Sequence, residues 1–128
     1  MKIMIVDDEQ DVEILFVQKF RKEIRNKQLE VEFAFSGEEA LQKLEEAGST
    51  EVVYVFSDIN MPGMSGLQLL EKIKAKYPTI QVSMISAYGD KDNFNLAIQS
   101  GAKGFFTKPV NFDSLKLEIS NLLTPSKD

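Results

Sequence analysis

Cysteine and histidine are both absent from this sequence of 128 residues. Without cysteine, the chain has no disulfide, no thiolate nucleophile and no cysteine-ligated metal site. Without histidine, it has no Ser-His or Cys-His nucleophile pair. Carboxylate oxygens are then the only anionic metal ligands, and they suit hard cations such as Mg²⁺ or Ca²⁺. These absences direct attention to the aspartates and glutamates.

Long apolar runs and long blocks of one charge are also missing. No run approaches the roughly 20 apolar residues of a membrane span. The short apolar stretch before Asp7, in "MKIMIVDD", is too brief for a signal-peptide core. We therefore expect no membrane span and a cytoplasmic location. The net charge of −5, without a long block of like charges, disfavours direct binding of nucleic acid.

Apolar runs alternate with segments of helical spacing, which is the pattern of a parallel sheet with helices on both faces. Strands are expected at residues 2–6, 31–35, 52–56, 82–85 and 104–107. Helices are expected at about 9–25 and around 36–44, 67–73, 94–98 and 115–122. Residues 52–56 are apolar on both faces, so that strand is predicted to be central, whereas the alternation in 31–35 indicates a strand nearer an edge.

The ends of these helices carry their own sequence signals. Residues that can cap or end them are Ser36 with Glu39, Asp90 or Asp92, Gly101 and Asn111. The units fill nearly the whole chain, and 43% hydrophobic residues suffice for one buried core. We expect a single doubly wound α/β domain with a five-stranded parallel sheet at residues 1–124, followed by a short polar tail at 125–128.

Polar side chains stand where the predicted strands end. In open parallel sheets, ligands bind beyond these carboxyl ends. The residues there include Asp7, Asp8, Asp58, Ser86 and Lys108. Gathered carboxylates raise one another's pKa unless a cation relieves them, so the three aspartates indicate a divalent ion. Mg²⁺ fits best, because few carboxylates leave positions for water and phosphate oxygens.

Such an ion beside a carboxylate suits phosphoryl transfer, which depends mainly on in-line positioning and neutralised charge. Asp58 would be the nucleophile. Lys108 can neutralise one phosphoryl oxygen, and the Ser86 hydroxyl can donate a hydrogen bond to another. A cis bond before Pro109, which X-Pro sequences tolerate, would help to aim the lysine inward.

Four motifs, "IVDDE", "SDINMPGMSG", "SMISAYGD" and "GAKGFFTKPV", together resemble the response-regulator receiver domain of two-component signalling, the CheY-like superfamily. The resemblance covers residues 2 to about 123. It implies a flavodoxin-like (βα)5 fold with strand order 2-1-3-4-5. It also implies that Asp58 accepts a phosphoryl group from a sensor histidine kinase or a histidine phosphotransfer protein.

The same resemblance implies the metal ligands. Asp8, Asp58 and the backbone carbonyl of Asn60 would ligate Mg²⁺, and Asp7 would hold a coordinated water. The chain would then be a phosphoacceptor signalling domain that assists its own phosphorylation and slow dephosphorylation, rather than an enzyme.

Switching residues are also implied by the resemblance: Ser86 as the switch hydroxyl and Phe105 as the switch aromatic. Phosphorylation would change the face of the fourth helix, fifth strand and fifth helix, which signals to a downstream effector or output domain. Threonine is more usual at position 86 and tyrosine is frequent at 105. Serine keeps the hydroxyl, whereas phenylalanine has none to offer a partner.

Two other functions remain open. An aspartate-nucleophile phosphatase shares the chemistry, but those enzymes usually show Asp-x-Asp, and here Asn60 stands at the position of the second acid. A pseudo-receiver that binds partners without phosphorylation is disfavoured because every site position holds a competent residue. Nucleotide binding is weaker still, since the chain has neither a P-loop nor a GxGxxG motif.

Two residues bear on the lifetime of an acyl phosphate at Asp58. Water must attack in line, so side chains over that approach govern hydrolysis. Asn60 is small and can orient a water molecule, whereas Tyr88 is bulky. Tyr88 either shields the acyl phosphate, which would make dephosphorylation slow, or simply packs on the loop surface.

Overall fold

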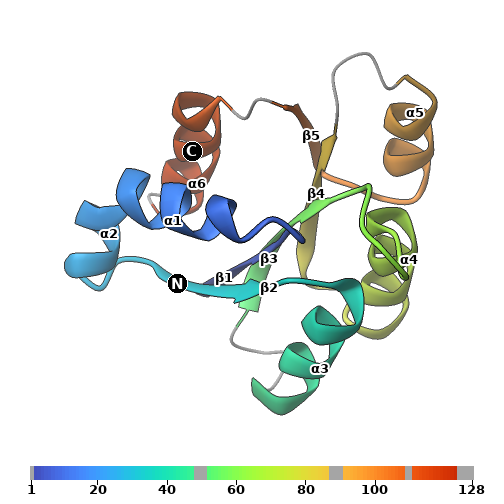
Figure 1. The fold of residues 1–128 in the computed structure, drawn as a ribbon, viewed down its shortest axis with the longest axis horizontal. Helices are drawn as coiled ribbons and strands as arrows, with labels where there is room; N and C mark the ends of the chain where they lie inside the picture. Colours follow the sequence, from blue (N-terminus) through green and yellow to red (C-terminus); the bar gives the residue numbers. More distant parts are fainter. Residues whose placement is uncertain (1, 48–51, 87–90, 109–110, 124–128) are drawn as a thin grey trace.

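The computed structural model describes residues 2–47, 52–86, 91–108 and 111–123. Its centre is a parallel sheet in the order β2-β1-β3-β4-β5 (Figure 1). The strands are β1 (Lys2–Val6), β2 (Glu30–Ala34), β3 (Val52–Asp58), β4 (Gln81–Ser86) and β5 (Gly104–Thr107). The predicted fold class and strand order are confirmed, with β3 central and β2 at an edge.

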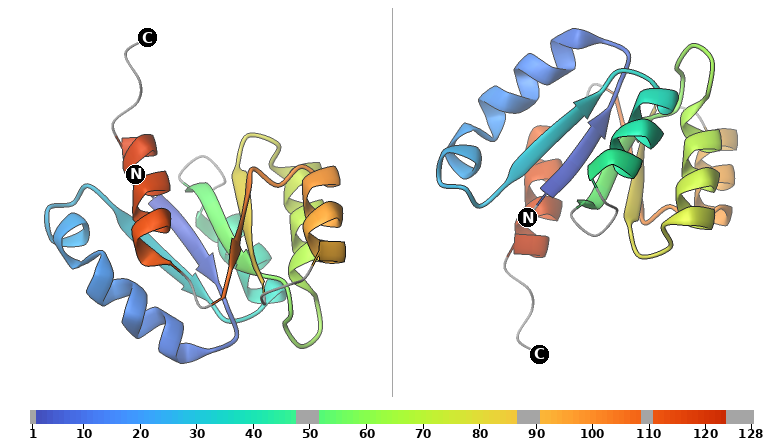
Figure 2. Two further views of the ribbon diagram at one scale, coloured as in Figure 1. Left: turned by 90° about the horizontal axis from the view of Figure 1, so that it is seen from above. Right: turned by 90° about the horizontal axis from the view of Figure 1, so that it is seen from below.

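Helices cover both faces of the sheet (Figures 1 and 2). One face carries α1 (Gln10–Lys19), α2 (Arg21–Arg25) and α6 (Phe112–Leu123), and the other carries α3 (Gly37–Ala47), α4 (Gly66–Lys76) and α5 (Lys91–Gln99). Each layer encloses its own apolar cluster. The sheet is therefore buried on both sides, as parallel sheets require.

The single helix expected at 9–25 is wrong, because the structure divides it into α1 and α2 at Phe20. The backbone of Phe20 leaves the helical region, at φ −108° and ψ 18°. Its fully buried ring stacks on Phe16, with ring centroids 4.5 Å apart. Apolar spacing continues through the break, so periodicity alone does not reveal it.

Predicted helix ends are largely confirmed. Asn111 Oδ1 accepts hydrogen bonds from the N–H groups of Asp113 and Ser114, which caps α6. Gly101 ends α5 with a left-handed φ of 99°. Ser36 accepts from the Glu39 N–H as expected, but the Glu39 carboxylate accepts from the N–H of Phe35 rather than that of Ser36.

The remaining predictions concern membrane-spanning helices, the start of α5 and the polar tail. Among the described residues, no helix has the length and apolar character needed to cross a bilayer. Asp90 and the tail at 125–128 lie outside the described residues. Asp92 does not cap α5 but lies within its first turn, where an acid suits the positive end of the helix dipole.

Candidate functional site

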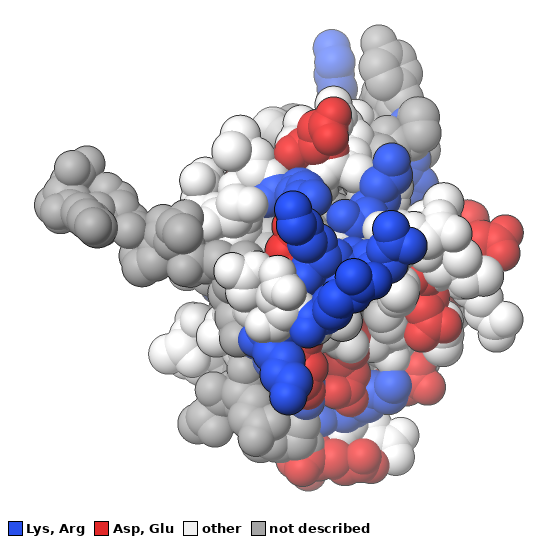
Figure 3. All heavy atoms as spheres, turned by 90° about the vertical axis from the view of Figure 1, so that its left-hand side faces the viewer, with Lys and Arg blue, Asp and Glu red and all other residues white. Residues whose placement is uncertain are grey.

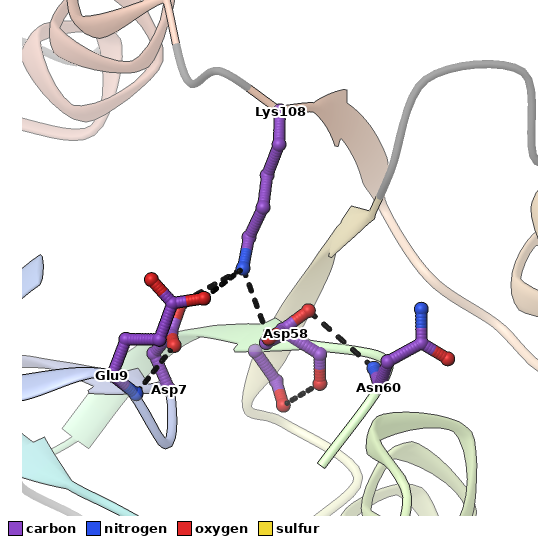
Figure 4. Close-up of polar contacts among 6 residues, drawn as sticks. Asp7, Glu9, Asp58, Asn60 and Lys108 are labelled. Carbon is purple, nitrogen blue, oxygen red and sulfur yellow. Dashed lines mark hydrogen bonds and ion pairs between the residues drawn. The ribbon is translucent and has the colours of Figure 1, made fainter.

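Polar residues from three strand ends meet at one edge of the sheet (Figure 4). Asp7 directly follows β1, Asp58 is the last residue of β3, and Lys108 directly follows β5. Strands β1 and β3 are neighbours, with Val6 beside Ser57, so the two aspartates lie next to each other. Asp7 is only 5% exposed and Asp58 only 4%. The topology thus brings two buried carboxylates and an ammonium group together.

The Lys108 ammonium lies between these carboxylates (Figure 4). Nζ donates to Asp58 Oδ2 at 3.0 Å, and it lies 3.4 Å from Asp7 Oδ2 and 3.9 Å from Glu9 Oε1. The Lys108 N–H donates to the carbonyl of Ser86 at 2.7 Å, which continues the pairing of β4 with β5. The sheet therefore fixes the backbone from which the side chain reaches inward.

Backbone N–H groups hold the other oxygen of each carboxylate. The Glu9 N–H donates to Asp7 Oδ1 at 2.9 Å, and the Asn60 N–H donates to Asp58 Oδ1 at 3.4 Å. The Asn60 side chain points away from Asp58 (Figure 4). Each buried carboxylate is thus oriented by a backbone donor on one oxygen and by Lys108 on the other.

The site contains fewer positive charges than negative ones. Burial raises the pKa of Asp58 above its ordinary value, and the hydrogen bond and charge of Lys108 oppose this without cancelling it. For Lys108, burial works to lower the pKa, but the contact with Asp58 and the charges of Asp7 and Glu9 outweigh it, so its pKa is raised. The lysine stays protonated, yet one ammonium does not balance the surrounding carboxylates.

A cation has a place beside these residues. One carboxylate oxygen from each of Asp7, Asp8 and Asp58 lies within 4.8 Å of the others, and Asp8 is the exposed member. Oxygen donors in small number match Mg²⁺, which keeps several of its waters. Burial and, less strongly, the charge of Asp7 raise the pKa of Asp58, and the positive charge of such an ion would oppose both effects. The donor set therefore fits the predicted Mg²⁺.

Comparison with known proteins decides the family. The profile described as the response regulator receiver domain matches residues 3–120. The chain belongs to this family.

Relatives of this receiver domain occur as short proteins and as parts of longer ones. Sporulation initiation phosphotransferase F of Bacillus subtilis (strain 168) is 30% identical over 122 residues, which cover 95% of the chain and 93% of that protein. A cyclic di-GMP phosphodiesterase of Thermotoga maritima is 38% identical over 90 residues, or 70% of the chain. The matched part is only 23% of the phosphodiesterase, so the activity of that whole protein is not carried over.

Solved structures show the same fold. A response regulator receiver domain protein from Clostridium thermocellum superposes with a TM-score of 0.82 at 30% identity, covering 95% of this chain and 93% of that one. Response regulator protein TrrA from Thermotoga maritima, solved in complex with Mg²⁺–BeF, gives a TM-score of 0.75 at 30% identity, covering 94% and 97%. Both solved structures therefore share the fold of this chain.

The remaining predicted residues of this receiver domain are placed as follows. Ser86 ends β4 and is fully buried, one position beyond Ile85, which pairs with Asp58. Phe105 lies in β5, half-buried, with its ring edge-on to that of Phe94 at 5.2 Å. The expectations for Tyr88 and for the bond before Pro109 fall outside the described residues.

Two residues that support the site were not predicted to do so. Glu9 approaches Lys108 and also orients Asp7 through its N–H. Gly66, the first residue of α4, lies so close to β3 that an added Cβ would stand 2.1 Å from the carbonyl oxygen of Asp58. The available signal for the second was the last glycine of "MPGMSG", which stands directly after the possible helix cap Ser65.

A hollow of about 270 Å³ opens beside Lys108. Its polar rim is formed by Asp7, Glu9 and Lys108, and its apolar wall by Val12, Leu15, Ile85 and Phe112. Leu15 on α1 is 46% exposed. An apolar surface on α1 and the start of α6 therefore adjoins the acidic site.

Mg²⁺ is expected to raise the melting temperature of the receiver domain, and Asp8→Ala is expected to remove most of this rise. At about ten times its Kd, the ion stabilises the folded state by about 1.4 kcal/mol. That free energy corresponds to a rise of about 4 °C for a domain of this size. Thermal unfolding followed by circular dichroism, with and without MgCl₂, measures the difference.

Asp11→Ala is the matched control for this experiment. Asp11 is an exposed acid in the first turn of α1 and lies outside the carboxylate cluster. The control should keep the full rise. Equal stabilisation of the parent protein and Asp8→Ala by Mg²⁺ would show that Asp8 is not a ligand.

Proposed function

We propose that this receiver domain accepts a phosphoryl group on Asp58 from the phosphohistidine of a sensor histidine kinase or a phosphotransfer protein in the cytoplasm. The observation that carries the proposal is the buried Asp58 carboxylate, paired with Lys108 at 3.0 Å beside two further aspartates. Membership of the receiver family supports it. So does the name of the Bacillus subtilis relative, a phosphotransferase.

The transfer forms one bond and breaks one. An Asp58 carboxylate oxygen attacks phosphorus in line, the phosphorus–nitrogen bond to the donor imidazole breaks, and the imidazole leaves with the bonding electron pair and takes up a proton. The Lys108 ammonium, already 3.0 Å from Asp58 Oδ2, neutralises a phosphoryl oxygen. The buried Ser86 hydroxyl donates to another.

The acidic residues have a separate task in this step. Asp8, Asp58 and the Asn60 carbonyl would hold Mg²⁺, with Asp7 on a coordinated water. The ion supplies positive charge next to the transferred oxygens. The backbone donors to Asp7 and Asp58 keep both carboxylates directed at this place before the donor arrives. The structure of the TrrA complex with Mg²⁺–BeF supports the assignment by similarity.

A phosphodonor protein would approach over the hollow beside Lys108. The apolar wall that includes Leu15 and Phe112 offers a contact surface, and Lys108 on the polar rim would attract the phosphoryl group of the phosphohistidine. In-line attack requires the imidazole to lie opposite the attacking Asp58 oxygen. We therefore propose that the partner contacts α1 and the start of α6.

Incubation with acetyl phosphate tests the proposal without the cognate kinase. Intact mass spectrometry of the protein with MgCl₂ is expected to show one added phosphoryl group per chain. With EDTA in place of MgCl₂, labelling should fall at least tenfold, because charge on the transferred oxygens is then poorly neutralised. Labelling that is equal under both conditions would contradict the Mg²⁺ requirement, and no labelling at all would favour a pseudo-receiver.

Phosphorylation is further proposed to switch the face formed by α5, β5 and α6. Phosphate on Asp58 would draw Ser86 inward, and Phe105 would move into the vacated space. Phe105 is half-buried and touches the partly exposed ring of Phe94 on α5, so its movement would change that surface. A downstream effector or output domain would read the change.

The switch predicts which amide signals move in NMR spectra. With a phosphoryl mimic and Mg²⁺, shifts should extend from the strand ends to Phe105 and residues 91–103. Ser86→Ala should still respond at the strand ends but lose the distant shifts, because the linking hydroxyl is gone. Shifts confined to the strand-end loops in the parent protein would refute the switch.

A further inference from the structure

A cluster of cations lies at the end of α1 and around α2, away from the acidic site. Five Lys and Arg side chains occupy residues 19–27, and all are exposed: Lys19, Arg21, Lys22, Arg25 and Lys27. These five residues are called the basic cluster below. Figure 3 shows Lys and Arg side chains crowding the face of the molecule that carries α2. The protein as a whole nevertheless has a net charge of −5.

The basic cluster is not neutralised within the molecule. Among the described residues, no carboxylate forms an ion pair with any of its members. The one acid within residues 19–27, Glu23, turns inward and pairs with Lys116 at 3.4 Å. Counting that acid, the segment carries +4, so the rest of the chain carries −9. The cluster is therefore a free positive surface on an acidic protein.

Helix stabilisation accounts for only part of the cluster. Lys19 lies in the last turn of α1, and Lys22 and Arg25 lie in the last turn of α2, where cations suit the helix dipole. Arg21 begins α2, at the end where a cation is unfavourable. Lys27 has a left-handed φ of 61°, a conformation that favours glycine or asparagine. Two cations are thus kept at positions where local structure disfavours them.

The positive and negative ends of the molecule are well separated. Helix α1 begins at Gln10, next to Glu9 of the acidic site, and ends at Lys19 of the basic cluster. Its 10 residues span about 15 Å. The Debye length at physiological salt is about 8 Å, so a surface held at the basic end is largely screened from the acids at the other. The chain is therefore a dipole with the acceptor site at its negative end.

We propose that the basic cluster binds the surface of a membrane that contains anionic lipids. A charged plane touches only one end of the molecule, so it attracts the basic cluster while the screened acids face away. Groups of four to eight cations bind anionic bilayers with about 1 kcal/mol each, which is about a fivefold gain in affinity per residue. Bound in this way, the receiver domain presents Asp58 away from the membrane.

Other anionic partners fit the same surface less well. The hollow that borders the cluster is lined by Ile24, Lys27, Leu29, Glu30 and Val31, so it offers an acidic peptide only one cation to pair with. Nucleic-acid binding is favoured by exposed aromatic rings for stacking, but the aromatic residues next to the cluster, Phe16 and Phe20, are buried. A long polyanion would also meet the −9 of the remaining surface.

Vesicle flotation with the full chain tests the proposal. The protein should float with phosphatidylcholine vesicles that contain about 30% phosphatidylserine at about 50 mM salt, and not with pure phosphatidylcholine. Salt at about 500 mM should release it, because screening shortens the range of the attraction. Failure to float with the anionic vesicles at low salt would overturn the proposal.

Two triple variants with the same net charge locate the binding surface. Arg21→Gln with Lys22→Gln and Arg25→Gln should weaken vesicle binding about a hundredfold, from about fivefold per cation. Lys72→Gln with Lys76→Gln and Lys91→Gln removes three exposed cations elsewhere. This control should change binding by less than about threefold. Equal losses in both variants would mean that net charge, not the cluster, governs binding.

Lys27→Gly separates binding from folding. Glycine relieves the left-handed backbone, so the urea midpoint should rise or stay the same. Vesicle binding should nevertheless fall about fivefold, from the loss of one cation. Unchanged binding in this variant would contradict the role of Lys27 in the cluster.

Orientation on the membrane gives the sharpest test. Because the chain has no cysteine, a single fluorophore can be placed by Asn26→Cys within residues 19–27 or by Gln10→Cys beside the acidic site. Lipids carrying a quencher should quench the first probe and leave the second bright. Quenching of both probes, or of the second alone, would overturn the proposal. So would cluster-dependent binding of a DNA duplex or a polyglutamate peptide without binding of the vesicles.

Discussion

Asp58→Asn is expected to abolish phosphoryl labelling by acetyl phosphate. The amide has nearly the shape of the carboxylate but no anionic oxygen to attack phosphorus, so the nucleophile itself is lost. The site around residue 58 also contains Lys108 and two other aspartates, buried Asp7 and exposed Asp8, and both aspartates follow β1 rather than ending β3. Intact mass spectrometry after a fixed incubation with MgCl₂ should therefore show only unmodified protein.

Asp92→Asn is the control for this loss. Asp92 is an exposed acid in the first turn of α5, so its replacement changes the net charge by the same amount without touching the site. It should be labelled as fast as the parent protein. Circular dichroism of Asp58→Asn should show an intact fold. Labelling of Asp58→Asn at the parental rate would move the acceptor to another residue.

Gly66→Ala is expected to be strongly destabilising although it adds one methyl group. The new Cβ would lie 2.1 Å from the carbonyl oxygen of Asp58 and 2.8 Å from Ile59 Cα, both backbone atoms that cannot rotate away. The Gly66 N–H also donates to the Ile59 carbonyl at 2.8 Å, which fixes this approach. Overpacking of this kind costs about 3 kcal/mol, or about 10 °C in melting temperature.

Gly37→Ala is the matched control, since Gly37 also begins a helix. The three atoms nearest to its new Cβ all belong to the side chain of Met64, with Sδ at 2.8 Å, and a flexible thioether can move. Urea denaturation should show a loss of less than about 1 kcal/mol for this variant. Gly66→Ala should also label more slowly, because the end of β3 must shift. Equal stability of the two variants would show that the close approach of Gly66 to β3 does not determine the loss of stability.

The fold was predictable because strand and helix periodicities alternate without interruption. The apolar run before Asp58 indicated a central strand, and β3 lies between β1 and β4. The same run extends two residues further than expected, so that Asp58 is part of β3 rather than of the following loop. The pairing of β3 with β4 continues to Asp58, which lies beside Ile85. A single sequence does not show where a neighbouring strand extends this pairing.

The break at Phe20 and the close approach of Gly66 were not predictable for related reasons. Both depend on what packs against the residue: the Phe16 ring in the first case and the β3 backbone in the second. Periodicity reports which face of a helix is buried, not how near its neighbour lies.

The sequence predicted which residues meet at the candidate site but not how they are arranged. Parallel strands end at one edge, so Asp7, Asp58 and Lys108 were expected to meet. Glu9 was visible as a third acid in the same turn, yet its approach to Lys108 depends on the path from β1 into α1. Some buried contacts elsewhere were also not predicted from the sequence. The Tyr54 hydroxyl, for example, meets Ser83 and Glu118 beneath α6.

Chemical trapping locates the phosphoryl group directly in the phosphorylated parent protein. After incubation with acetyl phosphate and MgCl₂, borohydride reduces an aspartyl phosphate to homoserine, and tandem mass spectrometry of the peptides finds the position. We expect homoserine at position 58 and at no other aspartate. Homoserine at Asp7 or Asp8 instead, or phosphate retained on a serine or threonine with Asp58 unchanged, would contradict it.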